Sequence, residues 1–112
     1  MFLRLPKVSP PIQMSSVATF VESAIQGNNI VVFAKTTCSY CFKAKQLLES
    51  KGLSFFVVDL DKRNDGPSIQ SYLTTKTNQR TVPNIFIKQA HIGGYSDLSA
   101  YSTSGGLDRL LN

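Results

Sequence analysis

The pattern of apolar and polar positions is helical in its first clear segment. Between Ser16 and Gly27 the apolar positions recur at spacings of three and four residues, and Gly27 ends the repeat. The apolar residues of this repeat are Val17, Phe20, Val21, Ala24 and Ile25. Such spacing places them on one face of a helix, and glycine commonly stands just past a helix end. We therefore predict an amphipathic helix over this segment.

Short apolar runs and further helical segments alternate in the rest of the chain. Residues 30–34 form a continuous β-branched and aromatic run, which is too short for a buried helix and typical of a strand covered on both faces. The predicted strands lie at 30–34, 54–60, 84–88 and around 91–92, with a turn at Gln89-Ala90. The further predicted helices run over about 38–51, from Gly66-Pro67 onward, and over 96–101 and 107–111.

The order of these elements predicts the fold class. It runs helix, strand–helix–strand, helix, two strands, and two final helices. Two strands joined through a helix are expected to be parallel, and two strands joined by a short turn are expected to form an antiparallel hairpin. The sequence thus predicts an α/β protein with a four-stranded mixed sheet and helices on both of its faces.

The composition is that of one small folded domain. The chain has 112 residues, of which 42% are hydrophobic and 17% charged, and this suffices for a single core. No apolar stretch approaches the ~20 residues that span a bilayer, so no membrane partner is expected. The net charge of +5 comes from scattered lysines and arginines, which favours a solvated surface over nucleic-acid binding.

The first residues differ in character from the rest. Residues 1–13 contain three prolines, two cations and no acid, without helical or strand periodicity. We predict a flexible N-terminal extension over 1–14 and one domain over 15–112. The segment lacks the long apolar run of a secretory signal, and it is shorter than a usual transit peptide. A cytoplasmic location is expected, with targeting to mitochondria or another organelle through the extension as the alternative.

The two cysteines of the chain, Cys38 and Cys41, stand where the first predicted strand meets the next helix. A helix N-terminus favours a thiolate, and the second sulfur lies within one helical turn of the first. Cys38 is therefore predicted as the attacking sulfur and Cys41 as the resolving sulfur. Zinc is disfavoured because the only other candidate ligand of its usual kind is the distant His91. A structural disulfide closing so short a loop would stabilise little.

The motifs around this pair resemble those of dithiol glutaredoxins. They are the Cys38–Cys41 pair, Thr81-Val82-Pro83 before the third strand, and the glycine pair followed by Ser96-Asp97 after the fourth. The likeness covers about residues 16–111 in the family's order. It implies a thioredoxin-like fold and a glutathione-dependent thiol–disulfide oxidoreductase acting on protein–glutathione mixed disulfides and protein disulfides. A thioredoxin-type reductase fed by a flavoenzyme is a rival interpretation.

The resemblance also implies which residues bind glutathione. They are Lys35, Tyr40, Gln70, Thr81, Val82, Pro83, Gly94, Ser96 and Asp97. Lys35 is expected to pair with the glycyl carboxylate and to favour the thiolate, and Gln70 matches a position that binds the same carboxylate. Tyr40 is expected to line the approach to the sulfur. His91 matches a strand position without a catalytic role, so we expect it to be structural or exposed.

The remaining glutathione contacts are expected from backbone groups and one carboxylate. Val82 would pair with the cysteinyl unit through its N–H and C=O, like an added strand, and Pro83 is implied to be cis. Gly94 would let the backbone approach the ligand, and the helix N-terminus at Ser96 would donate to the γ-glutamyl carboxylate. Asp97 would meet the γ-glutamyl ammonium, cap its helix, or do both.

Ser39 departs from the commonest dithiol glutaredoxin sequence, which has proline there. Serine restores a backbone donor and loosens the first turn around the thiolate. By resemblance, some glutaredoxins with serine at this position hold a [2Fe–2S] cluster between two subunits, each giving one cysteine, with two glutathiones. The alternative function is thus a cluster-bridged homodimer, a redox sensor or cluster carrier with Cys38 as the metal ligand. The first expectation is a monomer whose partners are glutathione and glutathionylated or disulfide-bonded proteins.

Overall fold

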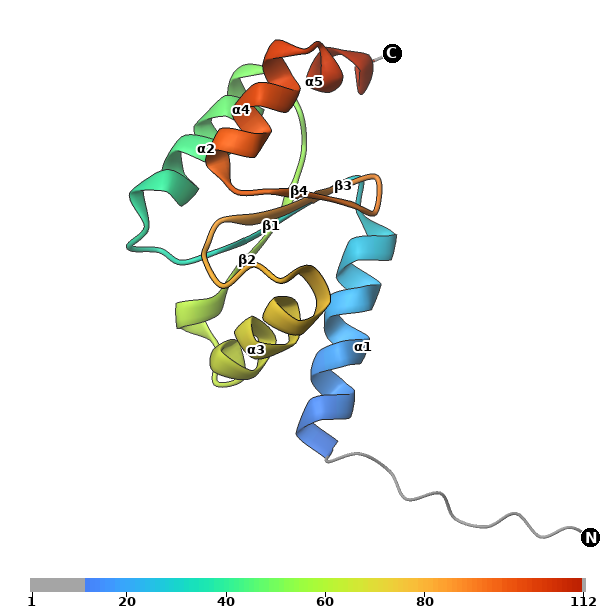
Figure 1. The fold of residues 1–112 in the computed structure, drawn as a ribbon, viewed down its shortest axis with the longest axis vertical. Helices are drawn as coiled ribbons and strands as arrows, with labels where there is room; N and C mark the ends of the chain where they lie inside the picture. Colours follow the sequence, from blue (N-terminus) through green and yellow to red (C-terminus); the bar gives the residue numbers. More distant parts are fainter. Residues whose placement is uncertain (1–11, 112) are drawn as a thin grey trace, which may run out of the picture.

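The computed structural model describes residues 12–111 as a four-stranded sheet between two layers of helices (Figure 1). The strands are β1 (Ile30–Ala34), β2 (Phe56–Asp59), β3 (Asn84–Ile87) and β4 (Ala90–Gly93). The helices are α1 (Ile12–Gly27), α2 (Ser39–Ser50), the 3₁₀ turn η1 (Leu60–Lys62), α3 (Gly66–Thr77), α4 (Tyr95–Thr103) and α5 (Gly106–Arg109). No helix within the described range is long and apolar enough to cross a membrane.

The sheet has the order β2-β1-β3-β4. β1 and β2 are parallel, with Val32 opposite Val57. β1 pairs antiparallel with β3, and β3 pairs antiparallel with β4. The predicted mixed sheet, with one parallel pair and a final antiparallel hairpin, is confirmed.

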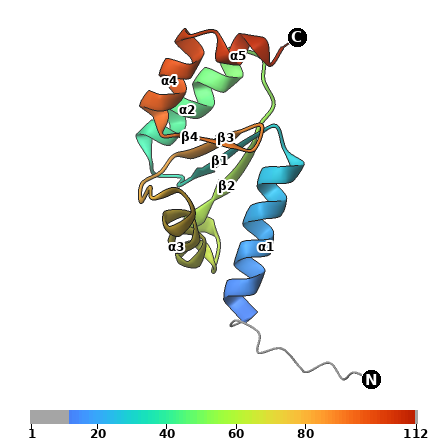
Figure 2. The same ribbon diagram turned by 45° about the vertical axis from the view of Figure 1, so that its right-hand side comes forward.

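The continuous apolar run of β1 is explained by the two helical layers. All five of its residues are buried. Val31 and Phe33 belong to the core on the side of α1 and α3, whereas Ile30, Val32 and Ala34 belong to the core under α2, α4 and α5. Figure 2 shows these layers on opposite faces of the sheet. Because successive side chains of a strand point to opposite faces, only a strand covered on both sides is apolar throughout.

Several element boundaries differ from the prediction, most clearly those of the first helix and the second strand. The first helix begins at Ile12 rather than Ser16, so it includes the end of the predicted extension, whose residues 1–11 lie outside the described range. β2 is shorter than the predicted 54–60, because the chain turns into η1 at Leu60. A Cβ on Gly66 would overlap the Leu60 carbonyl, so glycine lets this turn pack against the start of α3.

The hairpin turn lies one residue earlier than the predicted Gln89-Ala90. Lys88 and Gln89 both have positive φ, 52° and 71°, and Ala90 already belongs to β4. Two-residue hairpin turns favour left-handed backbone at both central positions, because this matches the twist of the flanking strands. The apolar pattern alone does not reveal which two residues take that conformation.

One end of the sheet gathers the predicted motifs. β1 ends at Ala34 and is followed by Lys35–Thr37 and α2, while the Val82–Pro83 peptide bond, which is cis as the resemblance implied, directly precedes β3. β4 ends at Gly93, and α4 follows it. Because β3 runs antiparallel to both β1 and β4, its start lies at the same end of the sheet as their ends. The fold therefore brings together segments more than forty residues apart.

Candidate functional site

Cys38 occupies the N-cap position of α2, with extended backbone (φ −98°, ψ 117°). Its own N–H donates to the Lys35 carbonyl oxygen at 3.2 Å. The N–H of Cys41 donates to the Cys38 Sγ at 3.1 Å. The same Sγ lies 3.7 Å from the carbonyl oxygen of Val82. The half-buried sulfur therefore lies between the helix N-terminus and the loop before β3.

Cys41 lies one helical turn further on and faces the core. It is a free thiol like Cys38, but its side chain is fully buried in the core under α2 and α4. Burial, followed by the hydrogen bond with Cys38, raises the pKa of the Cys41 thiol to about 12. Cys41 is therefore a neutral thiol at physiological pH, held beside the more accessible sulfur.

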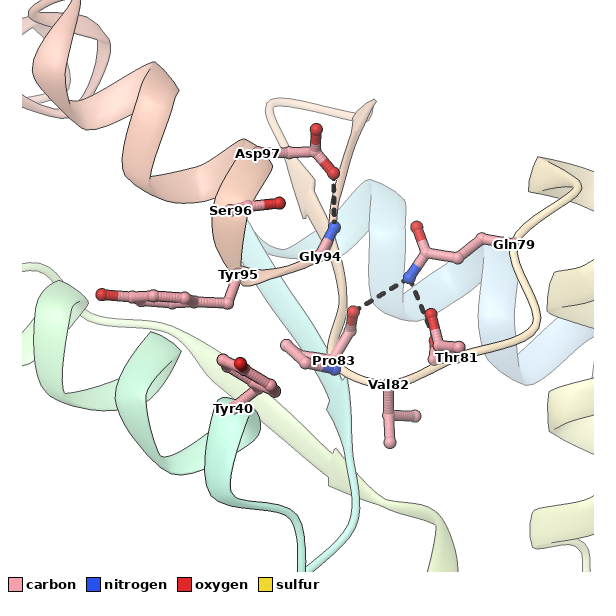
Figure 3. Close-up of a pocket in the computed structure, with 9 residues that line it drawn as sticks. All are labelled: Tyr40, Gln79, Thr81, Val82, Pro83, Gly94, Tyr95, Ser96 and Asp97. Atoms are coloured by element: carbon pink, nitrogen blue, oxygen red, sulfur yellow. Dashed lines mark hydrogen bonds between the residues drawn. The ribbon is translucent and has the colours of Figure 1, made fainter.

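A cavity of about 580 Å³ opens beside the Val82–Pro83 segment (Figure 3). Its walls come from α2, the loop before β3 and the start of α4. The lining residues are Tyr40, Gln79, Thr81, Val82, Pro83, Gly94, Tyr95, Ser96 and Asp97. Seven of the nine predicted glutathione-binding residues are among them, so the structure brings most of the predicted set together. Gln79 and Tyr95 were not predicted.

Asp97 supports the wall of the cavity that is formed by the start of α4. Its Oδ2 accepts a hydrogen bond from the Gly94 N–H at 3.0 Å, as Figure 3 shows. Gly93 has a φ of 122°, and a Cβ there would overlap the Asp97 carboxylate. The glycine is thus required both by its backbone conformation and by the approach of this side chain. Asp97 closes the N-terminal turn of α4, which is one of the two roles expected for it.

Two stacked rings form another wall of the cavity. The centroids of Tyr40 and Tyr95 lie 6.1 Å apart with an interplanar angle of 26°, and both rings project from their helices in Figure 3. The Nζ of Lys43 lies 5.2 Å from the Tyr40 centroid, within the range of a cation–π contact. Tyr95 packs against the Tyr40 ring, although no sequence motif marks it for this contact.

Lys35 and Gln70, the other two predicted residues, line a second cavity of about 540 Å³. It is completed by Leu60, Asp61, Arg63, Gly66 and Pro67. Arg63 is held by both carboxylate oxygens of Asp65, at 2.7 and 3.1 Å. Lys35, by contrast, is exposed and forms no ion pair within residues 12–111. The predicted carboxylate-binding pair thus lines one cavity and the other seven predicted residues line the first, with the Lys35 carbonyl oxygen hydrogen-bonded to the Cys38 N–H.

Asp61 holds the loop that connects β1 to Cys38. Its Oδ1 accepts from the Thr36 N–H at 3.0 Å, and its Oδ2 accepts from the Thr36 hydroxyl. These hydrogen bonds lower the pKa of Asp61 below its usual value. Asp61 was missed by the sequence analysis because no local pattern connects two residues 25 positions apart. The two hydrogen bonds hold Thr36, which lies between Lys35 and Cys38 in this loop.

His91 is exposed and makes a structural contact. Its Nε2 lies 2.8 Å from the Oδ1 of Asn84, the first residue of β3. The side chain of Asn84 is fully buried and also donates to the Thr77 hydroxyl at 3.3 Å. His91 thus belongs to a hydrogen-bond network with Asn84 and Thr77 and is not among the residues that line the cavity.

A family model described as glutaredoxin matches residues 30–92, more than half of the chain. The chain belongs to the glutaredoxin family. The match includes both cysteines and the Val82–Pro83 segment, and it ends before the Gly94–Asp97 wall of the cavity.

Two curated relatives cover most of this glutaredoxin. The chain is 43% identical to Glutaredoxin-1 of Rhizophagus irregularis over 98 residues, which are 88% of this chain and 97% of the relative. It is 46% identical to Glutaredoxin-C2 of Arabidopsis thaliana over 90 residues, 80% of this chain and 81% of the relative. The predicted enzyme class, a glutathione-dependent thiol–disulfide oxidoreductase, is confirmed.

The crystal structure of a complex between buckwheat glutaredoxin and glutathione has the same fold. It superposes with a TM-score of 0.85 at 35% identity, covering 92% of this chain and 94% of the buckwheat chain. The predicted thioredoxin-like fold is thereby confirmed.

The cluster-bridged homodimer stays a prediction for this glutaredoxin. A [2Fe–2S] cluster needs four ligands, here expected to be thiolates. Cys41 is buried, so each chain offers one accessible thiol, Cys38. Within the described part of the chain no three His, Cys, Asp or Glu side chains gather as a metal site. The available donors therefore fit a cluster only if two chains and two glutathiones share it.

Proposed function

We propose that Cys38 carries out glutathione-dependent reduction of protein–glutathione mixed disulfides, with the cavity beside it binding the glutathione unit. One observation carries this proposal: the half-exposed sulfur of Cys38 faces the Val82 carbonyl, and Val82 lines the cavity. A disulfide whose glutathionyl part lies along Val82 would present its sulfur to Cys38.

The two cavities offer groups that suit the two charged ends of glutathione. Glutathione has two carboxylates and one ammonium. The N-terminal turn of α4 at Ser96 offers backbone donors to the γ-glutamyl carboxylate. The Oδ1 of Asp97, which does not cap the helix, is available to the γ-glutamyl ammonium. Lys35 and Gln70, in the second cavity, would bind the glycyl carboxylate.

In the one-cysteine route, the Cys38 thiolate attacks the glutathione sulfur of a mixed disulfide. The bond between glutathione and the protein breaks, the protein leaves as a thiolate that takes a proton from water, and a Cys38–glutathione disulfide forms. A second glutathione thiolate then attacks the bound glutathione sulfur. Oxidised glutathione leaves, and the Cys38 thiolate is regenerated. The net reaction reduces the mixed disulfide to the protein thiol at the expense of one free glutathione, which leaves joined to the substrate's glutathionyl unit as oxidised glutathione.

Protein disulfides use the second sulfur. Cys38 first forms a mixed disulfide with one protein sulfur, and Cys41 then attacks Cys38 to release the protein and form Cys38–Cys41. Because the Cys41 thiol has a pKa of about 12, it must lose its proton as it attacks. Two glutathiones reduce the intramolecular disulfide afterwards. Cys41 thus acts only once Cys38 is already bonded to a partner.

The test is a coupled assay in which glutathione turnover is followed with a glutathionylated protein as substrate. We expect saturable turnover that depends strictly on glutathione. The same reaction is run with a thioredoxin-type flavoenzyme and its reductant in place of glutathione. Turnover with the flavoenzyme but not with glutathione would refute the proposal.

We further propose that residues 15–112 act as a monomer in the cytoplasm and that the 1–14 extension is dispensable for catalysis. The chain has two cysteines, and both lie at the redox site, so none serves a structural disulfide elsewhere; such cysteine usage suits a reducing compartment. Proteins starting at Met1 and at Met14 should show equal turnover and the same distribution in cells. Different distributions would support targeting by the extension, and a glutathione-dependent dimer in gel filtration would contradict the monomer.

A further inference from the structure

Gln79 makes two hydrogen bonds that no local sequence pattern indicates. It lies just past α3, after Asn78, which caps the helix in the left-handed conformation with a φ of 65°. The Nε2 of Gln79 donates to the carbonyl oxygen of Thr81 at 3.0 Å and to that of Pro83 at 2.9 Å, as Figure 3 shows. A primary amide nitrogen has two hydrogens, so both are used. Only the nitrogen can face two carbonyls, which fixes the orientation of the amide.

The two acceptors lie on either side of Val82. Gln79 does not engage the N–H and C=O of Val82 itself, but it fixes the residues before and after it. The Val82 carbonyl oxygen is the group that lies 3.7 Å from the Cys38 sulfur. The Pro83 carbonyl oxygen also lies 3.7 Å from where a Cβ on Gly94 would stand. One side chain thus holds the segment that contacts both the reactive sulfur and the opposite wall of the cavity.

Gln79 is itself anchored at its backbone. Its N–H donates to the Thr77 hydroxyl at 3.1 Å, and its carbonyl oxygen lies 3.4 Å from the Thr74 hydroxyl. The Thr77 hydroxyl also accepts from the buried side chain of Asn84 at 3.3 Å. Because α3 and the start of β3 hold its backbone, the Gln79 side chain acts as a fixed support between the helix and the Val82 loop.

We propose that Gln79 is a positioning residue of the glutathione site, which sets the orientation of the Val82 backbone by holding the carbonyls on both sides of it. The proposal rests on the proposed function, in which Val82 pairs with the cysteinyl unit of glutathione. Gln79 acts through Val82, whereas the Cys38 sulfur also keeps its hydrogen bond from the Cys41 N–H at the start of α2. Loss of Gln79 should therefore weaken glutathione binding far more than it changes the reactivity of the Cys38 sulfur.

The test uses Gln79→Met, which keeps the length of the side chain and removes both donors, and Gln79→Glu, which turns an acceptor-only carboxylate toward two carbonyls. The substrate is the mixed disulfide of glutathione with 2-mercaptoethanol. We expect KM to rise on the order of tenfold for Gln79→Met, the effect of one to two net hydrogen bonds. The rise should be larger for Gln79→Glu. The kcat and the alkylation rate of Cys38 should stay within about twofold.

The matched control is Gln89→Met in the hairpin turn at the other end of β3, an exposed glutamine outside the cavity. A KM for Gln79→Met within twofold of this control would overturn the proposal. An equal fall of kcat and of Cys38 alkylation would also overturn it, because it would show a general disturbance of the site.

A second measurement decides the matter even if the variants fold poorly. In NMR spectra of the isotope-labelled wild-type protein, the side-chain amide protons of Gln79 should exchange with solvent much more slowly than those of Gln89. Equal exchange would contradict the two hydrogen bonds. If wild-type protein shows no glutathione-dependent turnover, the proposed function fails, whereas slow exchange at Gln79 would still show that it holds the loop.

Discussion

Cys38 and Cys41 are one helical turn apart, yet they occupy opposite environments. The Cys38 side chain is half-exposed and lies between the N-terminus of α2 and the Val82 carbonyl oxygen. Its sulfur accepts a hydrogen bond from the Cys41 N–H. Cys41 has no exposed surface and packs in the core with Ala44 and Leu48. The comparison shows that the position along the first turn of a helix suffices to separate an accessible sulfur from a protected one.

The difference has a simple geometric cause. An N-cap residue lies outside the helix and has non-helical backbone, so its side chain turns toward the free N–H groups of the first turn. Cys41 is the third residue of α2, on the same face as the buried Ala44 and Leu48. Its desolvation stabilises the neutral thiol. We therefore expect chemistry to begin at one sulfur and to reach the other only through an intermediate.

The largest expected effect comes from removing the exposed sulfur. Cys38→Ser should reduce turnover of every disulfide substrate to the uncatalysed background, because a serine hydroxyl does not become a nucleophile near neutral pH. The coupled assay with a glutathionylated protein measures it. Residual activity above background would mean that Cys41 can attack substrates directly, which would remove the distinction between the two cysteines.

The second effect is the selectivity of alkylation. At pH 8, a thiol with a pKa of about 12 is deprotonated in only about one in 10⁴ molecules. Iodoacetamide should therefore modify Cys38 and leave Cys41 intact in the folded protein, as peptide mass spectrometry would show. Because the raised pKa favours the protonated thiol in the folded state, this protection should be strongest below the ordinary thiol pKa of about 8.5 and be lost as pH rises toward 12. Equal labelling of both cysteines at pH 8 would contradict the burial of Cys41.

The third effect depends on the substrate. Cys41→Ser should keep turnover of glutathione mixed disulfides within about threefold of wild type, because that route uses Cys38 alone. Reduction of a protein disulfide that needs the intramolecular step should fall by about tenfold or more, since the partner then remains bonded to Cys38. The two substrates are assayed side by side. An equal loss on both would refute the division of labour.

The smallest effect concerns substrate binding rather than sulfur chemistry. Lys35→Met should raise KM for a glutathione mixed disulfide on the order of tenfold, because a charge-assisted contact to the glycyl carboxylate is lost. The matched control is Lys88→Met in the hairpin turn, which should change KM by less than twofold. Alkylation should still select Cys38 in both variants. A fall in kcat with unchanged KM would place Lys35 at the sulfur instead of at the carboxylate.

Much of the fold and the position of the cysteine pair could be predicted because their determinants are local, whereas the glutathione-binding residues were implied by the resemblance to glutaredoxins. The fully apolar run of β1 indicates a strand covered on both faces. The cysteines follow it directly, and the glycine pair marks the turn into α4. Each of these signals lies within a few residues of the structure that it specifies.

The supporting contacts could not be predicted, because they depend on the folded backbone. Asp61 meets Thr36 from 25 positions away, and Gln79 reaches the Val82 loop directly after Asn78, which ends α3 in the left-handed conformation. No residue pattern marks either contact.

The most direct test of the account is to trap the intermediate. Cys41→Ser protein is mixed with a glutathionylated protein without free glutathione, quenched with acid, and digested for mass spectrometry. The account predicts one glutathione on the peptide that carries Cys38 and release of the partner as a free thiol. The partner protein bonded to Cys38, with free glutathione released instead, would contradict it.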